Sequence, residues 1–223
     1  MSGREAIARA LMNLPAGIVR WASAPAEQLP RQSTGVDALD DLLDGGWPKG
    51  RVCVLADDAA WAKTWSSGRT SLAVATAADA TRTGYLVAWV DGDASLDPAS
   101  LDAAGADLQR VLWVRGPMGV DRTLSATEEI LRAGGFEVVI VRPPRGVLRS
   151  QDPGWVRLSR AVERGRTTLL VLGGAGPSSA PGAVHVRLQD LHGTWANAPA
   201  LLLGAGTDVA TDAGETRVAL VPP

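Results

Sequence analysis

Residues 52–71 read Val-Cys-Val-Leu-Ala-Asp-Asp-Ala-Ala-Trp-Ala-Lys-Thr-Trp-Ser-Ser-Gly-Arg-Thr-Ser, and this stretch decides the fold. Its first residues, 52–56, are apolar and predict a short buried strand. Its last residues lead into an alanine-rich helix, expected over 70–80 and broken near Thr83-Gly84. A strand, a loop and a glycine at the start of a helix form the first unit of an α/β protein.

The loop in this unit is a degenerate form of the phosphate-binding pattern G-x-x-x-x-G-K-[ST], in which backbone N–H groups and a lysine hold phosphate oxygens. Lys63 stands at the first glycine position and Arg69 at the lysine position. One interpretation is residual phosphate or nucleotide binding at the helix start, by Gly68, Arg69, Thr70 and Ser71. The other is an inherited helix-entry turn, and the spoiled cradle favours this second interpretation.

Strands and helices alternate on both sides of this unit. Further apolar strands are expected at 85–90, 111–114, 136–141 and 167–172, and helices at 36–44, around a possible capping box Ser125–Glu128, and at 155–162. Apolar strands separated by helices indicate a mostly parallel central sheet covered on both faces. After Gly174 the residues alternate in polarity, with Gly193 and Gly204 as expected turns, which predicts an antiparallel C-terminal extension.

Length and composition are those of an ordinary globular protein. The chain has 223 residues, a net charge of −2 and one cysteine, Cys53, which we expect to be buried. No apolar run is long enough to span a bilayer, so a cytoplasmic location is expected. We divide the chain into an N-terminal helix and arm, 1–31, and a core domain, 32–223. His185 and His192 have no metal-ligand spacing, and no metal site is predicted.

The residues around the loop resemble those of RecA-like recombinases. Ser33-Thr-Gly-Val-Asp-Ala-Leu-Asp-Asp-Leu-Leu-Asp-Gly-Gly-Trp-Pro-Lys-Gly-Arg51 is similar to the segment S-T-G…L-D…G-G-(hydrophobic)-P-x-G-R that precedes their P-loop strand. Residues 84–98 look like the second RecA strand with its acidic turn, and 135–141 occupy the place of the Walker B strand. Order and spacing agree over about residues 30–175. The resemblance implies a RecA-like P-loop fold.

The departures from the RecA pattern affect every chemical part of the ATPase. The loop between Ala56 and Ser66 is longer and holds two carboxylates and two tryptophans. Arg142 ends the strand that should end in a magnesium-binding aspartate, and Asp93 replaces the catalytic glutamate. The DNA-binding loop is reduced to 173–182. We therefore expect no ATPase activity and no ATP or Mg²⁺ cofactor, and we read Asp91 and Asp93 as turn residues.

A compact, decayed RecA-like chain of this kind resembles the ImuA family of bacterial mutagenesis cassettes. The resemblance implies a non-catalytic adaptor in damage-induced translesion DNA synthesis (SOS mutagenesis). The partners that it implies are an ImuB-like Y-family polymerase homologue, RecA and, indirectly, an error-prone replicative-type polymerase. Two alternatives stay open at this point. One is an active P-loop ATPase or recombinase regulator with an atypical Walker A motif, and the other is a SulA-type cell-division inhibitor.

Candidate contact residues fall into two groups. Residues 142–166 hold seven arginines and only two acids, a local charge of +5. This cluster could meet an acidic partner, DNA phosphates or only solvent, and the contact candidates in it are Arg142, Arg145, Arg149, Arg157 and Arg160. Trp61 and Trp65, in the long loop, are candidates for a lid over the old nucleotide cleft or for a partner contact. The N-terminal helix and arm, residues 3–30, are candidates for self-association or for docking to RecA, and the alternative is a helix folded back on its own core.

Overall fold

The computed structural model describes residues 29–57, 68–144, 153–173, 182–195, 202–212 and 214–220, and side chains are described there except at 153, 190–195, 202–204 and 220. Several sequence predictions lie outside these ranges: the N-terminal helix with most of the arm, Trp61 and Trp65 of the long loop, and Arg145 and Arg149. The division of the chain at residue 31 likewise stays a prediction.

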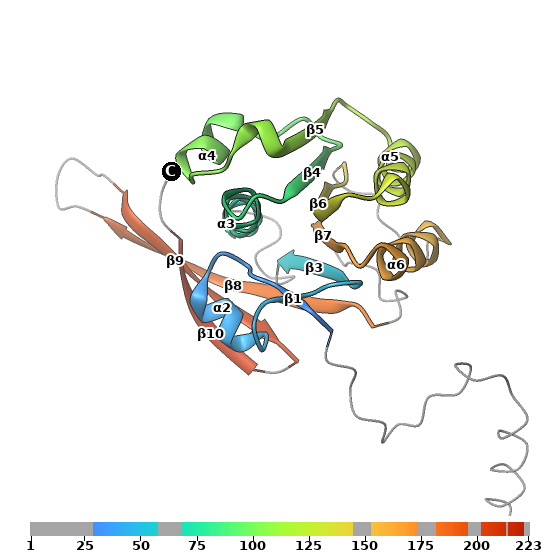
Figure 1. Ribbon diagram of the computed structural model, residues 1–223. Coiled ribbons are helices and arrows are strands. Elements are labelled where there is room, and N and C mark those ends of the chain that lie inside the picture. Colours follow the sequence, from blue (N-terminus) through green and yellow to red (C-terminus); the bar gives the residue numbers. More distant parts are fainter. Residues whose placement is uncertain are drawn as a thin grey trace, which may run out of the picture.

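Eight strands form one sheet in the order β10-β9-β8-β3-β7-β6-β4-β5 (Figure 1). The strands are β3 (Val52–Asp57), β4 (Leu86–Asp91), β5 (Val111–Arg115), β6 (Phe136–Arg142), β7 (Thr168–Leu172), β8 (Val184–Trp195), β9 (Leu202–Thr211) and β10 (Gly214–Leu220). The six strands from β8 to β5 run parallel, and β9 and β10 are antiparallel to their neighbours. The mostly parallel sheet and its antiparallel C-terminal extension are therefore confirmed.

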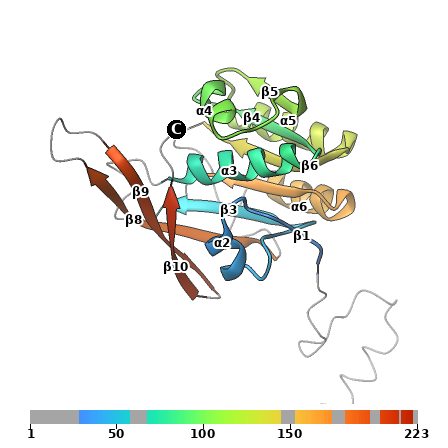
Figure 2. The ribbon, with the colours of Figure 1, turned by 60° about the vertical axis from the view of Figure 1, so that its left-hand side comes forward.

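Helices cover both faces of the sheet, as Figures 1 and 2 show. On one face lie α2 (Asp37–Leu42), α3 (Arg69–Arg82) and α4 (Pro98–Ala103), and on the other lie α5 (Val120–Ala133) and α6 (Pro153–Gly165). A short 3-10 helix, η1 (Leu108–Arg110), leads into β5. The two-residue strands β1 (Arg31–Gln32) and β2 (Trp47–Pro48) pair antiparallel beside α2. The fold is a three-layer α/β sandwich.

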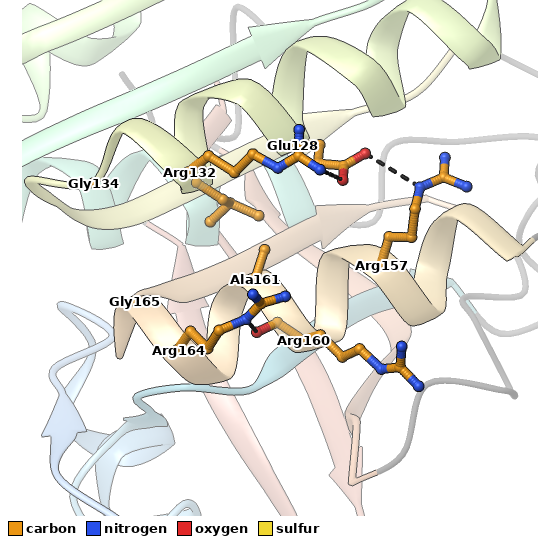
Figure 3. Close-up of a pocket in the computed structure, with 9 residues that line it drawn as sticks. Glu128, Arg132, Gly134, Arg157, Arg160, Ala161, Arg164 and Gly165 are labelled. Carbon is orange, nitrogen blue, oxygen red and sulfur yellow. Dashed lines mark hydrogen bonds and ion pairs between the residues drawn. The ribbon is translucent and has the colours of Figure 1, made fainter.

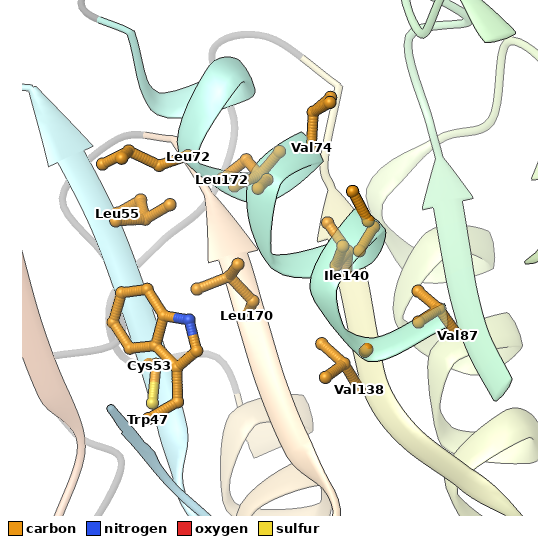
Figure 4. Packing of buried hydrophobic residues seen from close by; sticks show 14 of the residues in the cluster. Trp47, Cys53, Leu55, Leu72, Val74, Val87, Val138, Ile140, Leu170 and Leu172 are labelled. Atoms are coloured by element: carbon orange, nitrogen blue, oxygen red, sulfur yellow. The ribbon is translucent and has the colours of Figure 1, made fainter. Parts of the chain in front are cut away.

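Alternate residues of each central strand enter the two cores. Cys53 and Leu55 of β3 pack in the cluster beneath α2, α3 and α4, with Trp47 (Figure 4). Val52 and Val54 of the same strand pack in the cluster beneath α5 and α6. A strand with both faces covered must be apolar at every position, which is why the strands of this sheet read as continuous apolar runs.

Residues 33–51, the segment with the most specific family pattern, fix α2 against α3. Asp40 accepts hydrogen bonds from the Ser33 hydroxyl (2.8 Å) and from the Thr34 N–H (2.7 Å). The indole N–H of Trp47 donates to the Thr76 hydroxyl of α3 (3.1 Å), which also contacts the Thr34 carbonyl (2.8 Å). Both Trp47 and Thr76 are fully buried. These bonds pair polar groups whose burial would otherwise be unfavourable.

Glycine is required at two turns of this segment. Gly35 has φ +78° and Gly46 has φ +109°, in the left-handed region that favours glycine. A Cβ at Gly35 would lie 2.5 Å from the Ala75 carbonyl oxygen, and one at Gly46 would lie 2.3 Å from the Gln32 carbonyl oxygen. The backbones therefore approach too closely for any side chain, which accounts for the S-T-G and G-G elements of the pattern.

Three local predictions were wrong or incomplete. Ser125–Glu128 is not a capping box, because α5 begins at Val120 and Ser125 lies inside the helix. Gly193 and Gly204 are not turns, because they lie within β8 and β9 and pair across the ladder. Helix α4 was missed, although Asp97 accepts a hydrogen bond from Ala99 N–H and is followed by Pro98 at the first helical position.

Cys53 offers a direct measure of global unfolding. Its side chain is fully buried, and burial raises the pKa of its thiol from 9.0 to about 12. Since the thiolate is the reactive form, we expect folded protein at pH 8 to resist an aromatic disulfide reagent and urea-unfolded protein to react with one thiol per chain. Absorbance of the released thiolate measures both rates. Rapid labelling of the folded protein would contradict the buried position.

Candidate functional site

The candidate site lies where the carboxyl ends of four parallel strands meet the start of α3. Strands β3, β6 and β4 end there in Asp57, Arg142 and Asp91, and Gly173 follows β7. The Gly173 N–H donates to the Leu55 carbonyl (3.1 Å), which ties the end of β7 to β3. In open α/β sheets, ligands bind at the carboxyl ends of the strands, so this edge is where a site is expected.

Gly68 turns the chain into α3 with φ +85°, a conformation that suits glycine. The next residue, Arg69, forms an ion pair with Asp57 at the end of β3, with 2.5 Å between Nη1 and Oδ2. The Asp57 side chain is only 9% exposed, and its other oxygen, Oδ1, is buried without a hydrogen-bond partner among the described residues. The cation at the lysine position of the P-loop pattern is therefore paired with a carboxylate of the protein itself.

Arg142 crosses the site and connects two further elements. Its Nη1 donates to the Thr70 hydroxyl of α3 (3.0 Å), and its Nε donates to Oδ2 of Asp93 (3.2 Å). Thr70 occupies the [ST] position of the P-loop pattern, whose hydroxyl contacts Mg²⁺ in intact motifs. Arg142 and Asp93 are 15% and 16% exposed. A guanidinium thus holds the hydroxyl and the carboxylate together in a mostly buried place.

The acidic turn after β4 is built around this cation. Asp91 is fully buried and accepts hydrogen bonds from the N–H groups of Ser95 (3.2 Å) and Leu96 (2.8 Å). Asp91 therefore shapes the turn, in agreement with its interpretation as a turn residue. Asp93 accepts a hydrogen bond from the Ser95 hydroxyl (2.7 Å). Burial raises the pKa of Asp93, but the Ser95 hydrogen bond and the charge of Arg142 outweigh it, so that its net pKa is lowered.

Gly92 closes the turn against β6. Its N–H donates to the Arg142 carbonyl (2.8 Å), and a Cβ there would lie 2.8 Å from the Thr123 hydroxyl and 2.9 Å from the Arg142 carbonyl. The glycine thus lets the ends of β4 and β6 approach, and this approach places Asp93 beside the Arg142 guanidinium.

The described residues of the site do not fit a magnesium–nucleotide complex. A polyphosphate in the P-loop position needs free cations and donors, yet Arg69 is paired with Asp57. A divalent ion at Thr70 needs oxygen ligands and room, yet a guanidinium already contacts that hydroxyl. Like charge would also repel the metal. We therefore derive no catalytic step through a nucleotide.

The arginine cluster of the sequence is divided between two places. The sequence grouped Arg142 with the arginines of an exposed surface, and this grouping was wrong. Its guanidinium is bound to Thr70 and Asp93. Arg157 and Arg160 lie on α6 and are exposed. Ser71, the last residue of the P-loop remnant, is exposed on the first turn of α3.

Sequence reasoning missed the partners of these arginines. The carboxylates of Asp57 and Asp93 were identified only as poor neighbours for phosphate or as turn residues, whereas the structure pairs each with an arginine. The signal in the sequence that could have found them is a reversed charge at the end of a strand. Where a cation replaces an expected acid at the end of a strand, acids at neighbouring strand ends become its natural partners.

Among the described residues, no helix is long and apolar enough to cross a membrane. In the same ranges, no group of three or more His, Cys, Asp or Glu side chains is placed to hold a metal ion.

Comparison with known proteins places the chain in a family. Residues 11–146, more than half of the chain, match the model of the RecA N-terminal domain. The chain is 32% identical over 125 residues to Protein RecA of Rubrobacter xylanophilus, covering 56% of this chain and 34% of that protein. It is 36% identical over 110 residues to Protein RecA of Rhizobium rhizogenes, covering 49% of this chain and 28% of that protein. The chain thus spans about a third of the length of the curated relatives that it matches. It belongs to the RecA N-terminal domain family.

Proposed function

We propose that this chain is a non-catalytic RecA-fold adaptor in damage-induced translesion DNA synthesis. The single observation that carries the proposal is the position of Arg142, whose guanidinium bridges Thr70 and Asp93. This contact stabilises the α3 start and the β4 turn with the protein's own side chains. The RecA-like framework is retained, but side chains of the protein itself occupy the position of the nucleotide and its metal. Such a framework is better suited to binding a partner than to hydrolysing ATP.

The adaptor would join proteins of the damage response in the cytoplasm. Its proposed direct partner is a Y-family polymerase-like protein of the ImuB kind, with RecA as a second partner and an error-prone replicative-type polymerase reached indirectly. Direct DNA binding is not needed for this role. Self-association through residues 1–31 is a further part of the proposal.

Co-purification tests the adaptor role directly. The tagged full chain is expected to retain a Y-family polymerase-like protein of the ImuB kind, and separately RecA, when pure components are mixed. A tagged chain with Leu72→Asp, which places a charge in the core beneath α3, serves as an unfolded control. If the folded chain retains neither protein, the adaptor proposal is wrong.

Nucleotide titration separates the adaptor from the ATPase alternative. We expect calorimetry to give no saturable heat with Mg²⁺-ATP up to about 1 mM, which corresponds to a binding free energy weaker than about −4 kcal/mol. The physical reason is the pairing of Arg69 with Asp57 and of Arg142 with Thr70. Intact RecA in the same buffer is the positive control. Saturable binding together with turnover that Arg69→Ala abolishes would favour the ATPase instead.

A further inference from the structure

A groove of about 420 Å³ lies between α5 and α6, on the face of the sheet opposite to α3 (Figure 3). Leu131 of α5 and Ala161 of α6 line it, and both are buried. Among the described residues, its charged lining consists of one acid and four arginines: Glu128, Arg132, Arg157, Arg160 and Arg164. The groove is therefore partly apolar and strongly basic.

The acid among the described lining residues is already paired with two arginines. Glu128 receives Arg132 Nη2 at 2.8 Å and Arg157 Nε at 3.2 Å, and Figure 3 shows both side chains turned toward it. Arg160 and Arg164 have no acidic partner among the described residues. Arg164 Nε donates only to the Arg160 carbonyl (3.2 Å). The described lining of the groove therefore has a local charge of +3, in a chain whose net charge is −2.

A second hollow extends this surface along α6. It has about 210 Å³ and is lined by Arg51, Arg160 and Glu163 among others. Arg51 Nη1 and Glu163 Oε1 lie 3.7 Å apart and form an ion pair. Arg160 is the arginine that lines both hollows. Arg160 is thus the central side chain of the basic surface.

We propose that the α5–α6 groove docks a segment of a partner protein that carries both acidic and apolar side chains. Guanidinium groups bind carboxylates with two parallel hydrogen bonds, and Arg160 and Arg164 have donors available for this purpose. Leu131 and Ala161 provide a place for an apolar side chain between the cations. The inference rests on the proposed adaptor function in one respect: that function is the reason why the protein needs a partner.

A peptide fits these observations better than a nucleic acid does. Single strands are bound on aromatic side chains on which bases stack, and none of the described residues that line the groove is aromatic. A peptide side chain can use the apolar floor, whereas phosphates cannot. Charge complementarity alone would suit an acidic peptide and a nucleic acid equally. The apolar residues of the groove therefore favour the peptide.

Fluorescence anisotropy on the full-length protein tests the proposal. The probe is a fluorescein-labelled helical peptide of about four turns, roughly 15 residues, with glutamate and leucine at helical spacing. A second peptide with glutamine in place of glutamate tests the role of charge, and a single-stranded oligonucleotide of equal charge tests the other ligand class. We expect saturable binding of the glutamate peptide only, weakened by added salt.

Two charge-matched variants locate the binding. Arg160→Glu with Arg164→Glu is expected to raise the Kd of the glutamate peptide at least about tenfold. Arg82→Glu with Arg122→Glu, which reverses two exposed arginines outside the groove, should leave it within about twofold. Thermal denaturation followed by circular dichroism checks that both variants are folded. Equal binding to both variants, no peptide binding at all, or oligonucleotide binding that the groove variant abolishes would each overturn the proposal.

Failure of this inference is distinguishable from failure of the adaptor role. If the unmodified chain retains the polymerase-like protein or RecA, and the groove variant retains it equally well, the groove is not the docking face and the adaptor role stands. If the unmodified chain retains neither protein, the adaptor role fails, whatever the peptide titration shows.

Discussion

Arg142→Met is expected to lower the free energy of unfolding by about 2–4 kcal/mol at neutral pH. The methionine fills a similar volume but leaves the Asp93 carboxylate and the Thr70 hydroxyl without the donor they now share. Removing one partner of a fully buried pair costs roughly 3–5 kcal/mol. The expected loss is smaller because Arg142 and Asp93 each remain about 15% exposed. Urea unfolding followed by circular dichroism measures it.

The loss should shrink in acid. The pKa of Asp93 is lowered in the folded protein, so its contribution to stability is present above the unfolded value of about 3.9 and disappears as the pH falls through the folded value. The gap between the two proteins is therefore expected to be largest near pH 7.5 and to shrink as the pH falls below about 3.9.

A second substitution tests the cause of this loss. Arg142→Met combined with Asp93→Asn removes both charges, and it should be more stable at pH 7.5 than Arg142→Met alone. Arg157→Met serves as a matched control, because Arg157 pairs with Glu128 on the surface and is 55% exposed. Its effect should stay under about 1 kcal/mol. Equal losses at Arg142 and Arg157 would contradict the buried bridge.

Trp47→Ala is expected to have the largest effect of any change in the segment before β3, about 3–5 kcal/mol. The indole is fully buried in the cluster that includes Cys53 and Leu55 (Figure 4), and its removal leaves a large cavity. It also removes the donor to Thr76. Urea denaturation followed by circular dichroism measures the loss, and the rate of Cys53 labelling should rise with it.

Trp47→Phe separates packing from hydrogen bonding. Phenylalanine keeps much of the apolar volume but lacks the N–H that reaches Thr76, so a loss of about 1–2 kcal/mol is expected. Trp113→Phe is a useful control because Trp113, on the edge strand β5, is only half-buried. A Trp47→Ala protein as stable as the Trp113→Phe protein would show that the segment is not anchored through this indole.

The central layers could be predicted because their signal is local. Val52–Asp57, Leu86–Asp91 and Phe136–Arg142 are apolar runs between helices, and each lies within about a residue of its expected position. The path of β8 could not be predicted in the same way. Its alternating residues indicate a strand with one covered face, yet its first part pairs parallel with β3 and its later part antiparallel with β9.

The residues of the candidate site could be predicted from the sequence, but the contacts between them could not. The losses at Arg69 and Arg142 are visible in the sequence, because each departs from a pattern of known spacing. Their partners are not visible, because Asp57 and Asp93 meet them only when the strand ends are brought together. The groove between α5 and α6 depends likewise on Glu128, which takes up two of its four arginines.

The bridge made by Arg142 has a consequence for how the protein responds to its surroundings. A divalent ion comes and goes with its concentration and is withdrawn by a chelator, whereas a side chain is supplied once with every molecule. Arginine side chains in general carry a permanent positive charge. The corner formed by Thr70, Asp93 and Arg142 therefore has an internal counter-ion, and we expect its shape to be the same with and without magnesium.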